Sequence, residues 1–306
     1  AYISFQPRDF FNTVLYTGNT STNAITGVGF QPDVCWFKDR VSVYNHVLQD
    51  AVRGVTKTIY PDDDAAQDTY ANGQTSFDAD GFTLGNQATV FNKSGDDYVS
   101  WNWKANGAGS ANEDGSTNTT ATSANTTSKI SIGAFTGTGV AGMTVGHGLG
   151  VAPDFIVVKK TGGADRWGAY QAKNTAAPET EALYFNYDYA TTDDATFWND
   201  VSPSSSVVTF GDKGDLNATT TTVMYCWASV KGYSKFGRYI GTGSGGGDGP
   251  FIYTGFRPAF VIAKRTDSTG NWRVIDNKRN SYNGQYNTLE TSTSGVQYTG
   301  SDDFGN

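Results

Sequence analysis

Cysteine is scarce in this sequence, because the 306 residues contain only Cys35 and Cys226. The two cysteines fall in different copies of an internal repeat, described below, and at non-equivalent strand positions. A disulfide between them is therefore not expected, and we expect two buried free thiols. The fold must then gain its stability from packed cores.

Helical patterns and long apolar runs are also missing. No window of about 11–18 residues keeps an apolar stripe at helical spacing, and no apolar run approaches the roughly 18 residues of a membrane span. The opening residues 1–7 (AYISFQP) contain neither a basic n-region nor a long apolar h-region. We therefore expect no secretory signal and synthesis in the cytoplasm without export.

Charge is low and mainly acidic. Charged residues make up 17% of the chain, the basic ones are scattered, and the net charge is −8 with a pI near 4.7. Such a surface repels a phosphate backbone, which argues against nucleic-acid binding.

Aromatic residues and glycine are abundant instead, with 14% aromatics and 37 glycines. Aromatic and β-branched side chains pack well on a pleated sheet, while Gly, Asn and Asp supply the turns between strands. The predicted fold class is all-β, built from tandem β-sandwich domains of short strands.

One template occurs three times along the chain. A Gly and Pro turn leads into an apolar strand that ends in Lys, at residues 29–38 (GFQPDVCWFK), 150–159 (GVAPDFIVVK) and 255–264 (GFRPAFVIAK). Pro32, Pro153 and Pro258 are separated by the length of a small domain, which is longer than the period of a solenoid. Pro suits the first position of a strand because it donates no hydrogen bond.

Other blocks recur in the same order. Each copy opens with an aromatic-X-Gly step, at residues 16–18, 135–137 and 239–241, and later carries a segment that ends in a basic residue, at 50–53, 170–173 and 276–279. The first two copies close with aromatic strands, 98–103 (YVSWNW) and 222–227 (TVMYCW). The third copy has no such closing strand before residues 302–306.

The predicted organisation has five parts: an N-terminal leader at 1–10, copy one at 11–105, a linker at 106–128, copy two at 129–232 and a truncated copy three at 233–306. The linker is almost wholly Ala, Gly, Ser, Thr and Asn, which bury too little apolar surface to order themselves. It is predicted to be a linker, about which copy one could pivot, or an extended strap lying on another surface. Copies two and three follow each other directly and should be rigidly coupled.

The missing strands of copy three predict an unpaired sheet edge. Such an edge invites a partner chain to complete the sheet. We expect residues after about Phe251 to pair with another subunit or with further chain.

Several blocks together resemble the tandem-domain virion proteins of tailed bacteriophages, especially marine ones. They are residues 1–7, 50–57 (DAVRGVTK), 76–85 (SFDADGFTLG) and 232–237 (GYSKFG). The resemblance implies a tail or fibre component, located in the virion, with domains similar to jelly-roll or concanavalin-type sandwiches. No catalytic set belongs to that family, so none is carried over, and no cofactor is expected. The truncated third copy departs from the pattern.

Some motifs have a chemical interpretation and a simpler one. Asp78 and Asp80 begin like a calcium loop, but the rest of that loop is missing and an Asp-Gly hairpin turn explains them better. The acidic runs 62–64 and 193–194 offer oxygen ligands but are typical of solvated loops. The Gly-rich stretch 241–249 lacks the Lys-Ser/Thr ending of a phosphate loop and is interpreted as a hairpin tip.

Aromatic residues next to Asn and Asp form the strongest candidate binding surface. Flat apolar faces beside polar anchors are what a glycan or a protein partner needs. The candidate residues are Tyr187, Tyr189, Trp198, Asn199 and Asp200. His46 and His147, the only histidines, have no nucleophile motif beside them, and no metal site is predicted.

Four functions follow in order of preference. The first is a non-enzymatic structural and adhesive virion protein, a tail or fibre component that forms oligomers, contacts other virion subunits and attaches to the host. The second is a lectin-like module that binds bacterial surface glycans, and a capsid decoration protein is a further alternative. A depolymerase-like hydrolase, with two carboxylates facing each other in a groove, has the least support.

Overall fold

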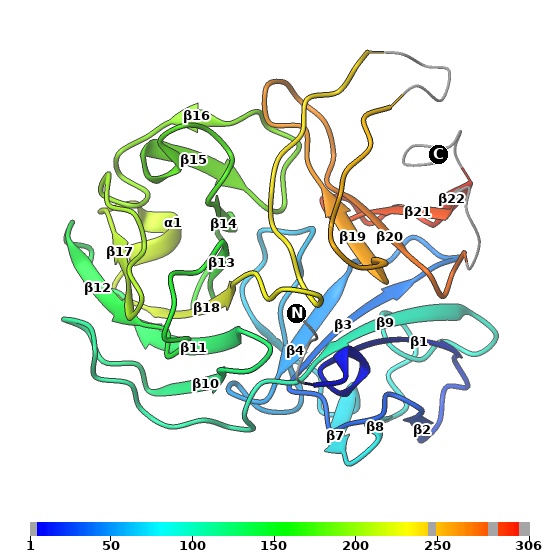
Figure 1. The fold of residues 1–306 in the computed structure, drawn as a ribbon. Helices are drawn as coiled ribbons and strands as arrows, with labels where there is room; N and C mark the ends of the chain where they lie inside the picture. The colour runs from blue at the N-terminus through cyan, green and yellow to red at the C-terminus, as the bar shows by residue number, and fades with distance from the viewer. Residues whose placement is uncertain (1–4, 244–248, 281–286, 300–306) are drawn as a thin grey trace.

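The computed structural model describes residues 5–243, 249–280 and 287–299. Residues 302–306 and most of the predicted Gly-rich tip lie outside these ranges, as does the start of the leader. The described chain is nearly all β, as predicted, and its strands form several antiparallel sheets. Figure 1 shows three groups of strands, one from each copy, around a common centre.

Copy one contains two sheets that face each other. A short helix η1 (Pro7–Asp9) precedes the main sheet, whose strand order is β1-β9-β3-β4. The smaller sheet has the order β2-β8-β7, and β5 and β6 form a separate pair. The bounds are β1 (Phe11–Thr17), β2 (Asn23–Thr26), β3 (Val34–Asp39), β4 (Val47–Asp50), β5 (Lys57–Thr58), β6 (Asp68–Thr69), β7 (Gln74–Asp78), β8 (Gly81–Leu84) and β9 (Asp97–Trp103).

Copy two repeats this plan with a wider main sheet. The sheet has the order β10-β11-β18-β13-β14-β15-β16, and β12 and β17 form the second layer. The bounds are β10 (Ala121–Asn125), β11 (Ile130–Thr136), β12 (Met143–Gly146), β13 (Phe155–Lys160), β14 (Gly168–Gln171), η2 (Pro178–Thr180), β15 (Glu181–Tyr184), β16 (Thr192–Asp193), β17 (Val207–Phe210), α1 (Gly214–Asn217) and β18 (Thr221–Trp227).

Copy three is a single sheet within the described residues. Its strand order is β19-β20-β21-β22. The bounds are β19 (Phe260–Ala263), β20 (Arg273–Asp276), β21 (Asn287–Glu290) and β22 (Tyr298–Thr299). Within the described residues, copy three therefore shows neither a second layer nor a closing strand, in line with the missing closing block of the sequence.

The alternation of side chains along the strands explains the layers. In β9, Val99, Trp101 and Trp103 point to one face and join the central core, while Tyr98 points to the other face and packs under the second sheet. In β18, Tyr225 and Met224 divide in the same way between the central core and the outer core of copy two. The middle strands are thus covered on both faces.

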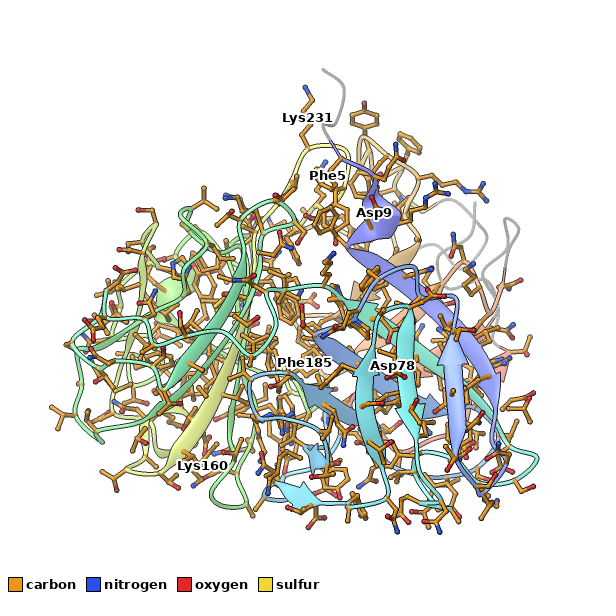
Figure 2. The ribbon with its side chains drawn as sticks, turned by 90° about the horizontal axis from the view of Figure 1, so that it is seen from below. Phe5, Asp9, Asp78, Lys160, Phe185 and Lys231 are labelled. Atoms are coloured by element: carbon orange, nitrogen blue, oxygen red, sulfur yellow. The ribbon has the colours of Figure 1, made fainter. Side chains whose placement is uncertain are left out.

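The central core is shared by all three copies. It joins Trp36 and Trp101 of copy one, Trp167 and Phe185 of copy two, and Trp272 of copy three. Phe185 lies at the centre of the molecule, between the copies, in Figure 2. Its ring centroid lies 5.8 Å from Trp36, 6.2 Å from Trp167 and 5.1 Å from Trp272.

This shared core corrects the expectation that copy one pivots. Apolar surface from each copy is buried against the other two, so a rotation of copy one would expose it to water. The recurring aromatics of the closing strands fill this interior, as the sequence predicts.

Residues 106–128 take the second of the two predicted forms, an extended strap. Their last part forms β10, the edge strand beside β11. Isolated bridges join Ser110 to Thr122 and Thr117 to Val145. Backbone pairing with copy two orders this segment, although its side chains bury little apolar surface.

Two further expectations concern the cysteines and the membrane. Cys35 and Cys226 are both free and buried, as predicted. Within the described ranges, no helix has the length and apolar character needed to cross a membrane.

Candidate functional site

The three copies have matching places in their strand registers. Phe37 pairs with Val47, Val158 with Gly168, and Ala263 with Arg273, one residue before each template lysine. We call residues equivalent when they hold the same place in this register. By this definition the template lysines Lys38, Lys159 and Lys264 are equivalent. Each copy also has a loop after the segment that pairs with its second strand, and these three loops are equivalent: 62–64, 186–188 and 292–294.

The equivalent lysines tie each copy to the loop of another. The Nζ of Lys38 donates to the carbonyl of Ser294 at 3.2 Å, that of Lys159 to Asp64 at 2.8 Å, and that of Lys264 to Asp188 at 3.2 Å. Copy one thus contacts copy three, copy two contacts copy one, and copy three contacts copy two. The three contacts form a closed ring with pseudo-threefold symmetry.

Burial changes the acidity of these lysines. It lowers the pKa of Lys38, Lys159 and Lys264 to about 8 in each case, and nearby carboxylates oppose the decrease. Carbonyl oxygens also accept hydrogen bonds from the buried ammonium groups, and these bonds stabilise the charge because an unpaired buried charge is costly. The lysines therefore act as positioning residues for the loops.

The loops meet at a pocket of about 300 Å³. It is open to solvent and receives residues from all three copies. The lining residues are Asp62, Asp63, Asp64, Asn186, Tyr187, Asp188, Asn271 and Ser292. Four of the eight are aspartates, so the pocket favours cationic or hydrogen-bond-donating groups.

Internal hydrogen bonds hold much of this lining. The carboxylate of Asp64 accepts from Asn186 Nδ2 and from Tyr187 Oη, both at 2.6 Å. Asn271 donates to Glu290 at 2.7 Å and accepts from Ser292 at 3.2 Å. These bonds fix the walls, because each crosses between elements or between copies.

Asp62 is the exception. Its carboxylate oxygens are inaccessible to solvent, and neither accepts a well-formed hydrogen bond. Burial raises the pKa of Asp62 to about 7, and the backbone amides and the charge of Lys38 oppose the rise. The described residues contain no cluster of His, Cys, Asp or Glu with the geometry of a metal site.

The structure separates the predicted contact residues. Tyr187 lines the pocket, and Tyr189 stacks on it with the ring centroids 4.7 Å apart and is 44% exposed. Trp198 is fully buried in the outer core of copy two. The interpretation of Trp198 as a surface contact is therefore wrong, because its ring packs against Tyr170 and Phe210.

Asn199 and Asp200 form a turn after that buried tryptophan. Both have positive φ angles, 54° and 52°, which Asn and Asp tolerate better than most residues. Asp200 is exposed, and neither residue lines the pocket. They belong to a separate surface turn.

Asp78 and Asp80 lie at the β7–β8 hairpin of copy one (Figure 2 labels Asp78). Asp78 accepts from the hydroxyls of Ser76 at 2.7 Å and Thr83 at 2.6 Å, and Asp80 accepts from the amides of Gly27 and Gly29. Both carboxylates are used to hold the hairpin and its neighbouring loop.

The two histidines are structural. Trp36 Nε1 donates to His46 Nδ1 at 3.0 Å, so His46 Nε2 carries the proton that it shares with the carbonyl of Glu290 at 3.1 Å. Burial lowers the pKa of His46 well below its usual value, and it also lowers the pKa of His147. Both rings are neutral at pH 7 and bonded at both nitrogens.

A comparison with known families places the whole chain in one of them. The profile of a domain of unknown function, DUF7483, matches residues 6–305. The chain belongs to the DUF7483 family. The matched range includes residues of all three copies. No curated protein and no solved structure matches the chain.

From the sequence alone, the acidic run 62–64 is predicted to be a solvated loop, and no local signal marks Asn271 or Ser292. The signal for these DUF7483 residues lies in the repeat. Asp62, Asn186 and Ser292 are equivalent by strand register. Aligning the third strands of the copies would have grouped them.

Proposed function

We propose that this protein is a non-enzymatic structural and adhesive subunit of a tailed-phage particle, a tail or fibre component that presents the pocket-lining loops to the host surface. The resemblance of four sequence blocks to such virion proteins supports this assignment. The geometry adds a working surface, because loops from three copies converge at one pocket that is open to solvent.

The observation that carries the proposal is the ring of lysine–carbonyl contacts. An adhesive surface must hold its shape when a partner binds, since ordering mobile loops reduces affinity. Lys38, Lys159 and Lys264 fix the three loops against one another.

Particle labelling and cell binding test this function. Antibodies against the chain should label particles of the phage that encodes it and should reduce adsorption to the host. The purified chain should bind host cells, and Asp188→Asn should weaken that binding more than Asp212→Asn, a substitution away from the pocket. Unlabelled particles would refute the virion assignment, and equal binding by the two variants would refute the role of the loops.

Glycan binding is a second candidate because of one observation. Tyr189 exposes part of its ring while stacked on pocket-lining Tyr187, next to Asp188 and Asn186. An aromatic face beside hydrogen-bonding side chains is suited to sugars. A glycan array probed with the chain and with Tyr189→Ala should give signals that the variant loses, and a silent array would remove this candidate.

A further inference from the structure

The pocket between the three copies has two chemically different sides. Copies one and two contribute all four of its aspartates, which are Asp62, Asp63, Asp64 and Asp188. Copy three contributes Asn271 and Ser292, and both are neutral. A ligand that matches both sides must combine a positive charge with groups that form hydrogen bonds.

The carboxylate of Asp188 has its full capacity to bind a cation. It accepts no hydrogen bond from the described part of the chain. The carbonyl of the same residue is fixed, because it accepts from Lys264 Nζ at 3.2 Å and from the amide of Gly270 at 2.8 Å. Lys264 lies near this carboxylate, but its ammonium group donates to carbonyl oxygens. The backbone therefore positions a side chain that is still unpaired.

Asp63 and Asp64 add two carboxylates whose positions are already set. Asp63 accepts from Asn45 at 3.2 Å and from the amide of Ala65 at 2.8 Å. The two bonds to Asp64 from copy two were described above. An ionised carboxylate offers about four lone pairs, so each of the two keeps capacity toward a donor on a ligand.

The carboxylate of Asp62 is an unpartnered group in the same lining. Both of its oxygens are shielded from solvent and accept no well-formed hydrogen bond within the described chain. The charged groups that act on it are Lys38 of β3 and Asp63 of its own loop, and the nearby ring of His46 is neutral. A buried carboxylate without partners is unfavourable. A positive charge bound in the pocket would stabilise it.

The side formed by copy three supplies donors and acceptors for hydroxyl groups. Asn271 Nδ2 donates to Glu290 at 2.7 Å, and Ser292 Oγ donates to Asn271 Oδ1 at 3.2 Å. An amide nitrogen has two N–H donors, and a hydroxyl oxygen has two lone pairs. One donor of Asn271 and both lone pairs of Ser292 therefore stay available to a ligand.

We propose that this pocket binds a primary amine that also has hydroxyl groups, as an amino sugar does. The ammonium group lies among the carboxylates of copies one and two, and the hydroxyls face Asn271 and Ser292. A metal ion fits less well, because the described residues contain no acidic cluster with metal-site geometry. The volume, about 300 Å³, is at the small end of ligand pockets and suits one sugar unit. The inference rests on the proposed adhesive function only for the source of the amine, the host surface.

A matched set of small ligands tests the two sides separately. Glucosamine has the ammonium group and the hydroxyls, glucose replaces the ammonium group by a hydroxyl, butylamine lacks the hydroxyls, and calcium chloride supplies a metal ion alone. Each is titrated into the full chain by calorimetry at about pH 6 and low ionic strength. We expect one-to-one binding of glucosamine with a dissociation constant of about 0.1–5 mM. The other three should bind at least about tenfold more weakly.

Substitutions then assign the two sides. Asp188→Asn should weaken glucosamine binding at least about fivefold. Asp212→Asn is the matched control, because it removes an exposed carboxylate of copy two that does not line the pocket. Ser292→Ala should weaken glucosamine binding and leave the weaker binding of butylamine unchanged. Circular dichroism checks that each variant folds like the wild type.

Asp62 provides a readout that a purely structural carboxylate would not move. With a pKa of about 7, Asp62 is largely protonated at about pH 6, so an ammonium group that enters the pocket should ionise it and release a proton. Calorimetry in two buffers with different ionisation enthalpies measures this proton. Asp62→Asn should abolish the release.

Each outcome decides a part of the proposal. Absence of glucosamine binding at about 50 mM, equally tight binding of glucose or butylamine, a response to calcium alone, or unchanged binding by Asp188→Asn would overturn it. Equal proton release by the wild type and Asp62→Asn would overturn the role of Asp62.

Competition on cells separates the ligand from its source. Glucosamine should reduce the binding of the chain to host cells. Glucosamine binding without loss of cell attachment would uphold the pocket and overturn the host surface as the source of the amine. Unlabelled particles would refute the virion function and leave the binding of glucosamine to the pocket intact.

Discussion

The hydroxyl of Tyr225 offers a sharp test of how strongly the copies depend on one another. Tyr225 Oη of copy two donates to Asp50 Oδ2 of copy one at 2.5 Å, and both groups are buried. Tyr225→Phe keeps the ring and its stacking on Trp227 but leaves the carboxylate with Arg53 as its remaining partner. A hydrogen bond to a charged group contributes about 1.5–3 kcal/mol to stability.

We therefore expect Tyr225→Phe to lower the free energy of unfolding by about 1.5–3 kcal/mol, a ten- to hundredfold change in the unfolding equilibrium. Urea unfolding should be followed both by tryptophan fluorescence and by far-UV circular dichroism, and the two curves should coincide. Tyr189→Phe is the matched control, because the Tyr189 hydroxyl has no hydrogen bond within the described chain. A loss below about 0.5 kcal/mol, or separate transitions for the copies, would refute the shared-core reasoning.

Three further predictions concern single residues. The pKa of Asp62 in the folded chain, about 7, exceeds its unfolded value, so the free energy of unfolding decreases as pH rises from about 4 to 7. Asp62→Asn should abolish this decrease and stabilise the chain by about 1–2 kcal/mol at pH 8 but not at pH 4. An unchanged dependence of stability on pH would contradict this prediction. Trp198→Ala should lower the free energy of unfolding, measured in urea, by about 3–5 kcal/mol, as expected for a buried tryptophan. An unchanged free energy of unfolding would contradict the burial of Trp198. Gly81→Ala should lower the midpoint of thermal unfolding markedly, because its φ is +151° and an added Cβ would lie 2.0 Å from the carbonyl oxygen of Ile25; an unchanged midpoint would contradict that close approach.

The sequence predicts the strands well because their signals are local. Alternating aromatics mark β9 and β18, and the Gly and Pro turns mark β3, β13 and β19. The single sheet of copy three within the described residues also agrees with the sequence, since the aromatic closing block does not recur in residues 233–306. These features depend on period-two patterns and on turn residues, which a single sequence contains.

The arrangement of the copies could not be predicted in the same way. The composition of residues 106–128 suggests disorder, but pairing of β10 with β11 overrides it. Trp198 lies beside polar residues in sequence, yet it enters a core built from distant strands. The pocket depends on three loops that meet only because the sheets share one centre, and that contact is nonlocal.

Hydrogen exchange of the unmodified chain tests the central claim, that the three copies share one core and that β19, within the described residues, is paired along one edge only. Residue-resolved exchange rates should be measured for the amides of β3, β13 and β19. The account predicts that one set of alternate amides in β19 exchanges far faster than the equivalent amides of β3 and β13, because no ladder protects that edge. Equal protection of all three strands would contradict the claim.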